Sequence, residues 1–226
     1  MDVFFSNEDR EEYLSQLREQ GERFGVRYLA WCLMTNHVHL IAIPESESSL
    51  ARGIGEAHRR YTRYINFREG WRGYLFQGRF HSCPLDGNYL LAATRYVLRN
   101  PVRAGIVKHP WDYEWSSTRW LVGLADTDPL AEESPMLDDV TDWKAFLSMD
   151  EKAGAEVRKS TRTGRPLGSE RFIDQLESLT GRSLRPKKRG PKRKSQVLCP
   201  RNLGISDAIG FCAETGVPFL GRKELR

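Results

Sequence analysis

The chain has no long apolar run and no leader-like start. None of its 226 residues belong to a stretch that approaches the eighteen consecutive apolar residues of a membrane-spanning helix. The first five residues lack the basic region and the apolar core of a signal peptide. Hydrophobic residues make up 39% of the sequence, which suffices for one core of ordinary size. These features predict a soluble intracellular protein with no membrane association, built as one domain with an appendage.

Cysteine is scarce and irregularly spaced. The four cysteines, Cys32, Cys83, Cys199 and Cys212, contain no Cys-x-x-Cys pair. Zinc knuckles and redox motifs depend on that spacing, and an intracellular protein rarely keeps disulfides. We therefore expect four free thiols with structural or incidental roles.

Acidic residues are absent from one segment near the C-terminus. Residues 182–194 carry eight basic side chains and no acid, so the net charge of +5 leaves −3 for the rest of the chain. Proline and glycine interrupt this segment, which favours a disordered tail over a helix. Such a tail binds phosphates without sequence preference. The eight residues are Arg182, Arg185, Lys187, Lys188, Arg189, Lys192, Arg193 and Lys194.

A second basic block, residues 52–79, mixes arginines with aromatic residues. It holds seven arginines against Glu56 and Glu69. Two interpretations stay open: the aromatic rings stack on unpaired bases, or they form the core face of an amphipathic helix whose arginines are solvated. The aromatic residues are Tyr61, Tyr64, Phe67, Trp71, Tyr74 and Phe76.

Local signals predict the order helix, strand, strand, helix, strand, helix. Ser6 is a good N-cap for the first helix, and Gly25 ends it. The turn Thr35-Asn36 separates two apolar runs typical of a β-hairpin, and Pro101 interrupts the last helix. The expected ranges are about 7–23, 26–34, 37–43, 49–68, 78–83 and 86–100.

Two histidines, His37 and His39, lie two residues apart in an apolar run. On a strand, residues i and i+2 point to the same face, so both imidazoles would project together. This pair is a candidate metal site. The alternative is a pair of partly buried histidines satisfied by hydrogen bonds.

Tyr96 and Asn100 have the i, i+4 spacing that places two side chains on one face of a helix. Two imidazoles and an amide oxygen can hold a divalent ion while leaving positions for phosphate oxygens. A neighbouring phenol could then attack phosphorus, with a base or a positive field to favour the phenolate. The alternative for Tyr96 is a core tyrosine with its hydroxyl at the surface.

Three ordered motifs resemble a known family. Residues 34–40, residues 75–80, and residues 96–107 followed by Trp115-Ser116-Ser117 are similar to the REP-associated tyrosine transposases, IS200-like members of the single-tyrosine HUH transposase superfamily. The similarity extends over about residues 5–122. The basic segment 164–194 also resembles the C-terminal region of many such bacterial proteins. The implied fold is α+β, with a ferredoxin-like antiparallel sheet and helices on one face.

The resemblance implies a metal-dependent enzyme that cuts and rejoins DNA strands. Tyr96 matches the nucleophile that forms a 5′-phosphotyrosine on single-stranded DNA. His37, His39 and Asn100 match the residues that hold Mg²⁺ or Mn²⁺. The expected partner is single-stranded or hairpin-forming palindromic DNA, and the expected protein is a monomer or homodimer in the bacterial cytoplasm, associated with the nucleoid.

Several basic residues are candidates for contacts with DNA phosphates. No motif assigns them, and they are chosen for their place in the two basic blocks. They are Arg59, Arg60, Arg63, Arg79, Lys187, Lys188, Arg189, Lys192, Arg193 and Lys194.

The N-terminus departs from the family pattern. Family members begin with a strand that lies centrally in the sheet beside the histidine strand, and this sequence starts where that strand should already have ended. Without it, the strand of His37 and His39 would expose an apolar edge. We expect a transposase domain at 1–123, a helical extension at 124–181 and a basic, disordered tail at 182–226.

Two hypotheses of different class follow from these features. The first is an active transposase-type nuclease and strand transferase. The alternative is a truncated or domesticated, inactive DNA-binding remnant that keeps the motifs without turnover. A metal-binding ferredoxin-like module without DNA ranks last, since it leaves Tyr96, Asn100 and both basic blocks unexplained.

Overall fold

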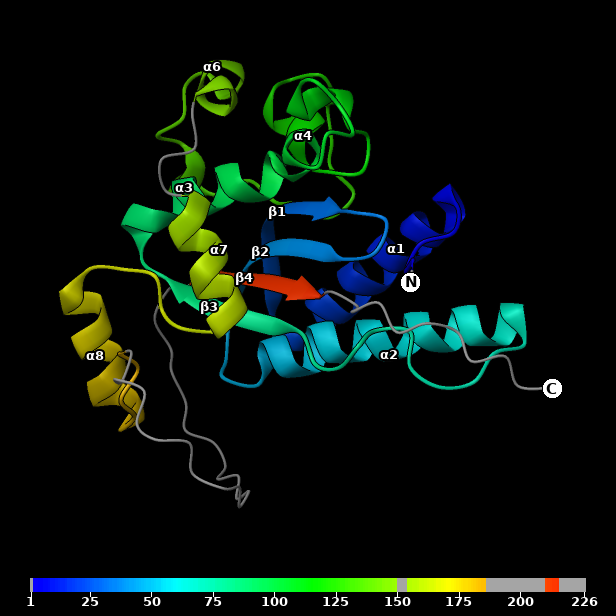
Figure 1. The fold of residues 1–226 in the computed structure, drawn as a ribbon, viewed down its shortest axis with the longest axis horizontal. Helices are drawn as coiled ribbons and strands as arrows, with labels where there is room; N and C mark the ends of the chain where they lie inside the picture. Colours follow the sequence, from blue (N-terminus) through cyan, green and yellow to red (C-terminus); the bar gives the residue numbers. More distant parts are fainter. Residues whose placement is uncertain (1, 150–153, 186–209, 216–226) are drawn as a thin grey trace.

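The computed structural model describes residues 2–149 and 154–185, and the backbone of residues 210–215. Its architecture is α+β and ferredoxin-like, as expected, with a four-stranded antiparallel sheet between helices (Figure 1). The strands lie in the spatial order β1-β2-β4-β3. They are β1 (Val26–Leu33), β2 (Val38–Pro44), β3 (His81–Leu85) and β4 (Gly210–Thr215). The α-helices are α1 (Asn7–Phe24), α2 (Ser49–Glu69), α3 (Gly87–Leu98), α4 (Asn100–Arg103), α5 (Thr118–Leu121), α6 (Trp143–Ser148), α7 (Gly154–Thr163) and α8 (Glu170–Thr180).

Helix α1 begins and ends as its sequence predicts. Ser6 and Asp9 form a reciprocal capping box, in which each side chain accepts a hydrogen bond from the other residue's backbone. Gly25 adopts a left-handed conformation, φ 67°, and ends the helix. The Asp9 carboxylate, fully buried, also forms an ion pair with Arg68, so it ties the start of α1 to the end of α2.

The hairpin β1-β2 places both histidines at one end of the sheet. Leu33 pairs with Val38 across the turn, and Val26 pairs with Pro44 at the far end. His37 immediately precedes β2, and His39 is its second residue. Alternate residues of β2 therefore face opposite sides of the sheet, with His39 on the side opposite to Leu40.

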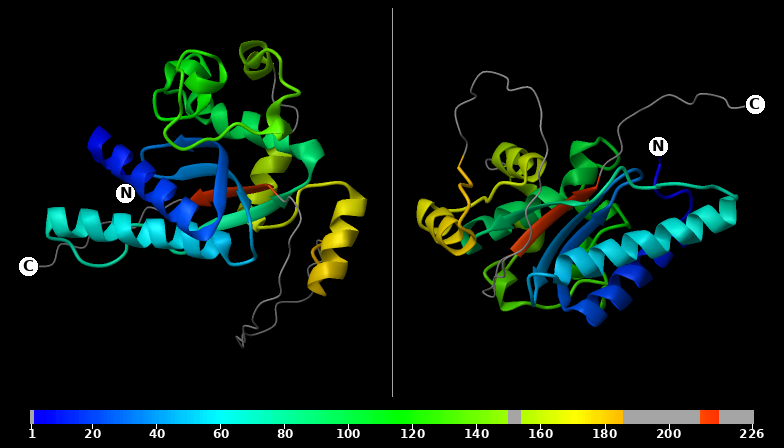
Figure 2. Two further views of the ribbon diagram at one scale, coloured as in Figure 1. Left: turned by 180° about the vertical axis from the view of Figure 1, so that it is seen from behind. Right: turned by 90° about the horizontal axis from the view of Figure 1, so that it is seen from below.

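Each face of the sheet buries its own core. Leu40, on one face, belongs to the cluster that includes Leu17 of α1 and Ile54 of α2. Ile41, on the other face, belongs to the cluster that includes Leu90 and Val97 of α3. Figure 2 shows α1 and α2 together on one side of the sheet and α3 on the other. The expectation of helices on one face thus holds for α1 and α2, whereas α3 covers the opposite face.

The position beside the histidine strand is filled by the C-terminal strand β4. It pairs antiparallel with β2, where His39 is opposite Glu214, and with β3, where Cys83 is opposite Cys212. Residues 2–6, which precede α1, contain no strand. Residues 2–6 thus do not form the first strand that the family resemblance implies. Strand β4 takes the position beside β2 where that strand was expected. Residues 210–215 of the expected C-terminal tail form β4 between β2 and β3, and residues 186–209 and 216–226 of that tail lie outside the described residues.

The elements around Tyr96 differ slightly from the expected ranges. The third strand covers 81–85 instead of about 78–83, and α3 ends at Leu98. Arg99 leaves helical geometry, with φ −85° and ψ 1°, and α4 begins at Asn100. This break agrees with Pro101, which cannot donate to the helix ladder.

Helices α6 and α7 pack onto α3, on the same side of the sheet as Tyr96 (Figure 1). The guanidinium of Arg95 lies 3.9 Å from the centre of the Phe146 ring, and Val157 of α7 is fully buried in the same core. The division of the chain at residues 123 and 181 stays a prediction. In the described part of the chain, no helix has the length and apolar character needed to cross a bilayer.

Candidate active site

His37 and His39 lie side by side, as the strand geometry predicts. Their ring centres are 4.8 Å apart and the rings are nearly perpendicular. His39 is fully buried, and His37, which immediately precedes β2, is partly exposed. The Nδ1 atom of His37 lies 2.7 Å from the side-chain oxygen of Asn36. That contact uses Nδ1, and no hydrogen bond to Nε2 is formed within the described residues.

The buried imidazole of His39 has no hydrogen-bond partner on either nitrogen among the described residues. A buried polar atom without a partner costs free energy, so its presence needs an explanation. Burial lowers the pKa of His39 well below its ordinary value, and the charges of His37 and Arg103 add to this effect. Burial, with the charge of Arg103, also lowers the pKa of His37 to about 4. Both rings are neutral at physiological pH and offer lone pairs.

Tyr96 of α3 reaches the histidines from the facing helix. Its ring centre is 6.0 Å from that of His39, and its side chain is only 5% exposed. Arg103 places its guanidinium 4.0 Å from the centre of the Tyr96 ring, and its Nη2 donates to the Tyr96 carbonyl at 2.9 Å. A cation at this position stabilises negative charge that develops on the phenol.

Asn100 is close to these residues in the chain and is 9% exposed. It begins α4 after the break at Arg99, so its relation to Tyr96 is not that of one continuous helix. In the part of the chain that the structure describes, no hydrogen bond joins the Asn100 side chain to His37, His39 or Tyr96. The assignment of Asn100 as a third metal ligand therefore stays a prediction.

The donor set fits a divalent ion in part. The His39 ring lies next to the His37 ring, and its nitrogens have no hydrogen-bond partner among the described residues. Two neighbouring imidazoles on one strand could bind a metal ion in this arrangement. The described residues contain no group of three or more His, Cys, Asp or Glu side chains suited to a metal. A complete site would therefore need an amide oxygen such as that of Asn100, or oxygen atoms of the substrate.

A cavity of about 460 Å³ opens beside Tyr96. Tyr96 and Arg103 form one wall, and α7 forms the other with Arg158, Lys159 and Arg162. No carboxylate is among the described residues that line it. This cavity has the positive charge that a phosphodiester requires.

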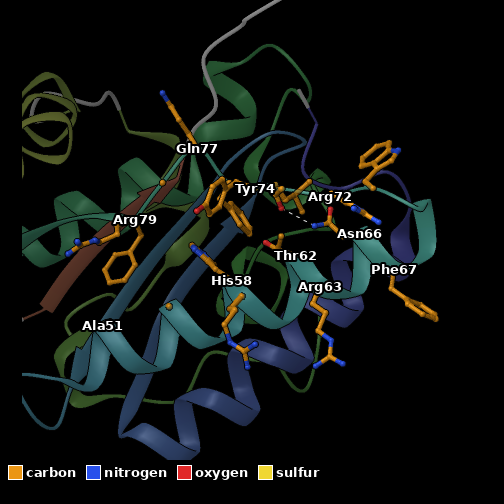
Figure 3. Close-up of a pocket in the computed structure, with 18 of the residues that line it drawn as sticks. Ala51, His58, Thr62, Arg63, Asn66, Phe67, Arg72, Tyr74, Gln77 and Arg79 are labelled. Carbon is orange, nitrogen blue, oxygen red and sulfur yellow. Dashed lines mark hydrogen bonds between the residues drawn. The ribbon is translucent and has the colours of Figure 1, made fainter. Parts of the chain in front are cut away.

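A larger groove, of about 1240 Å³, lies between α2 and the loop that leads to β3 (Figure 3). His58, Thr62 and Asn66 line it from the helix, while Gln77 and Arg79 line it from the loop. Large aromatic side chains stand exposed at its rim, where Phe67 is 91%, Tyr74 94% and Trp71 42% exposed. None of the described lining residues is acidic. The groove lies on the α2 side of the sheet, away from Tyr96.

The candidate DNA-binding arginines differ in their charge balance. Arg59 pairs with Glu56 at 2.6 Å, and Arg60 pairs with Glu56 and Glu19 at 3.1 and 3.2 Å. Arg63 and Arg79 are exposed at the groove and form no ion pair within the described residues. Lys187, Lys188, Arg189, Lys192, Arg193 and Lys194 lie outside the described residues.

The second basic block combines both interpretations that the sequence left open. Tyr61 is buried in the core and donates to the Val3 carbonyl, while Phe67 and Tyr74 are almost fully exposed. The block is therefore an amphipathic helix over most of its length and an aromatic surface at its end.

Sequence analysis missed the basic residues of α7 and did not single out Arg103. Arg158 and Arg162 have the i, i+4 spacing of a basic helix face, which was the available signal. That spacing alone does not tell which surface the helix faces. Arg72, a further basic residue at the groove, was counted in its block but not assigned a role.

The comparisons with known proteins yield a match, which covers the N-terminal part of the chain. Residues 2–100 match the family model described as "Transposase IS200 like". This matched region includes His37, His39, Tyr96 and Asn100. Curated proteins and solved structures yield no match to the chain.

Proposed function

From the similarity of residues 2–100 to the IS200-like transposases, we propose that this chain is a transposase-type single-stranded DNA endonuclease and strand transferase. It acts on palindromic DNA that folds into hairpins, through a 5′-phosphotyrosine intermediate. The observation that carries the proposal is the approach of Tyr96 on α3 to His39 on β2, with 6.0 Å between ring centres.

Tyr96 acts as the nucleophile. Its phenol oxygen attacks the scissile phosphorus, the bond from phosphorus to the 3′ oxygen breaks, and the strand leaves with a free 3′-OH. The phenol loses a proton to solvent or a base, and the departing 3′ oxygen gains one. The reverse reaction by another 3′-OH releases Tyr96 and joins strands without an external energy source.

His37 and His39 would hold Mg²⁺ or Mn²⁺ through neutral imidazole nitrogens, with Asn100 as the third protein ligand. When bound, such an ion polarises the scissile phosphate and stabilises the charge that develops on it. The chain itself supplies the fixed orientation of both rings, the low polarity around His39 and the positive charge of Arg103 beside Tyr96.

DNA outside the cleavage point would lie in the groove between α2 and the 70–80 loop. Arg63, Arg79 and Arg72 form no ion pair within the described part of the chain and offer their charge to phosphates. The exposed rings of Tyr74 and Trp71 offer surfaces for unpaired bases. Arg59 and Arg60, which are paired with Glu56, contribute less than these three arginines. The segment of Lys187, Lys188, Arg189, Lys192, Arg193 and Lys194 adds non-specific contacts.

The test is covalent adduct formation by the full chain. The protein is incubated with Mn²⁺ and a panel of 5′- or 3′-labelled hairpin oligonucleotides, and the products are separated under denaturing conditions. We expect a labelled protein band with Tyr96 modified at its phenol oxygen, identified by peptide mass. Tyr96→Phe should abolish it, while Tyr89→Phe on the same helix should retain it.

The same assay separates the active enzyme from an inactive remnant. Hairpin binding in a gel-shift assay without any adduct, across the whole panel and with both Mg²⁺ and Mn²⁺, would support the remnant and refute the enzyme. An adduct that persists in Tyr96→Phe would assign the nucleophile to another residue.

A further inference from the structure

The cavity beside Tyr96 is built by two segments that lie far apart in the chain. Tyr96 and Arg103 come from α3 and α4, and Arg158, Lys159 and Arg162 come from α7. Helix α7 is fixed in this place by Val157, which is fully buried in the core of the α3 side. The family match ends at residue 100, so α7 lies outside the matched region.

Three of the basic side chains that line this cavity, all on α7, have no ion-pair partner among the described residues. Arg158, Lys159 and Arg162 are exposed and form no ion pair among the described residues. The acidic residue of α7, Glu156, is not among the residues that line the cavity. Gathering cations in one concave site costs electrostatic free energy unless an anion is bound there. A phosphodiester is the anion that a tyrosine nucleophile would meet.

We propose that α7 is a phosphate clamp for the strand that Tyr96 attacks, with Arg158 and Arg162 as its principal contacts. This inference rests on the proposed function for the identity of the anion. Two arginines one helical turn apart can each present a planar fork to phosphate oxygens. They hold the phosphate next to the Tyr96 phenol and stabilise the charge that its oxygens gain during attack. Arg103, over the Tyr96 ring, positions the phenol on the opposite wall.

The first experiment measures adduct formation in a single turnover with the full chain, Mn²⁺ and a hairpin oligonucleotide that the wild type cleaves. The double variant Arg158→Gln/Arg162→Gln should form the adduct about a hundredfold more slowly, in the range seen when a transition-state hydrogen-bond donor is removed. Its affinity for the oligonucleotide should fall less than tenfold, because other basic surfaces remain. Arg171→Gln, on α8, is the matched control and should stay within twofold of the wild type.

The second experiment needs no catalysis and uses inorganic phosphate as the probe. Thermal unfolding of the full chain is followed in EDTA at constant ionic strength, with phosphate replacing chloride. Phosphate that binds only the folded state raises the melting temperature, and the rise grows with the logarithm of the phosphate concentration once that concentration exceeds the dissociation constant. We expect this logarithmic rise in the wild type and in Arg171→Gln, and its loss in the double variant. Because the substituted side chains are exposed and the double variant removes two like charges from the cavity, it should melt in chloride at a temperature no lower than that of the wild type.

The two readouts separate this inference from the proposed function. If the wild type forms no adduct, the proposed function fails, and loss of the phosphate effect in the double variant still supports the clamp. An adduct formed at wild-type rate by the double variant refutes the clamp and leaves the proposed function standing. A phosphate effect that is unchanged in the double variant also refutes the clamp.

Discussion

Cys83 of β3 and Cys212 of β4 lie directly opposite each other in the register of the sheet. They are separated by 129 positions in the sequence, so the pairing depends on the C-terminal segment entering the sheet between β2 and β3. Strand β4 joins the strand of His39 to β3, which leads directly into α3 and Tyr96. The candidate site therefore relies on a segment that follows it by more than a hundred residues.

This pairing predicts that the native cysteines can be cross-linked within one chain. Opposite Cα atoms of an antiparallel pair lie within the 4.4–6.8 Å range that disulfides require, at about 4.5 or 5.5 Å. Mild oxidation of the full-length protein should yield a peptide pair joining Cys83 to Cys212, detected by mass spectrometry without reduction. Cys83→Ser should remove it. A pair found only between two chains would instead indicate strand exchange, and its absence would contradict the register.

His39 should stabilise the apoprotein less than an apolar residue would. Both of its nitrogens are buried and have no hydrogen-bond partner among the described residues, and replacing such a group by an apolar one of similar shape can be neutral or stabilising. We expect His39→Leu to unfold in EDTA with a free energy equal to the wild type or up to about 2 kcal/mol higher. The same variant should lose the stabilisation by Mn²⁺ that the wild type shows. Urea unfolding with and without the ion measures both effects, and a large loss of stability in EDTA would contradict the orphaned-ligand interpretation.

Prediction from sequence succeeded where structure depends on neighbouring residues. The capping box of Ser6 and Asp9 and the hairpin that presents His37 and His39 follow from short-range patterns. The approach of Tyr96 to His39 needed the resemblance to a family, because no local pattern tells which face of the sheet α3 covers.

Long-range features could not be predicted in this way. The sequence of β4 does not indicate which strands it pairs with. Its pairing depends on the open edges of β2 and β3, which form far away in the sequence. The spacing of Arg158 and Arg162 predicts only a basic helix face. The packing of α7, which places both residues at the cavity beside Tyr96, is visible only in the structure. Arg60 and Arg63 lie in the same basic block, and Arg60 differs by its ion pairs with Glu56 of its own helix and with Glu19, which only the packing of α1 against α2 brings close.

That difference between Arg60 and Arg63 predicts unequal roles in DNA binding. Arg63 lines the groove with no carboxylate partner among the described residues, whereas Arg60 is paired with Glu19 and Glu56. Arg63→Gln should weaken binding of a single-stranded oligonucleotide and reduce the slope of log affinity against log salt by about 0.7, the value for one phosphate contact on a single strand. Arg60→Gln should change this slope by much less. Fluorescence anisotropy across a salt series measures both, and equal slopes for the two variants would argue against the groove.

His58 should make the fold sensitive to mild acid. It is buried, lies 2.9 Å from the Tyr13 hydroxyl through Nε2, and stacks on Phe76 with 4.0 Å between ring centres. Burial lowers the pKa of His58 to about 3 from an ordinary value of 6.5. Above pH 6.5 the ring is neutral in both the folded and the unfolded chain, so its contribution to stability is fully present. As the pH falls below 6.5, the unfolded chain binds a proton that the folded chain refuses until about pH 3.

The free energy of unfolding should therefore fall by about 1.4 kcal/mol per pH unit on account of His58 across that window. The partly exposed His37 and the buried His39, whose pKa values are also lowered, add losses of the same sign. The buried Asp9 loses its ion pair only at lower pH because its pKa is depressed. His58→Gln keeps an acceptor for Tyr13 but does not titrate. Urea titrations in EDTA measure the free energy of unfolding of both proteins between pH 4 and 6. As the pH falls, this free energy should decrease less steeply in His58→Gln, and the difference in slope should correspond to about one proton bound on unfolding. Parallel curves for the two proteins would show that His58 does not become protonated on unfolding, and would place the acid sensitivity at the other histidines.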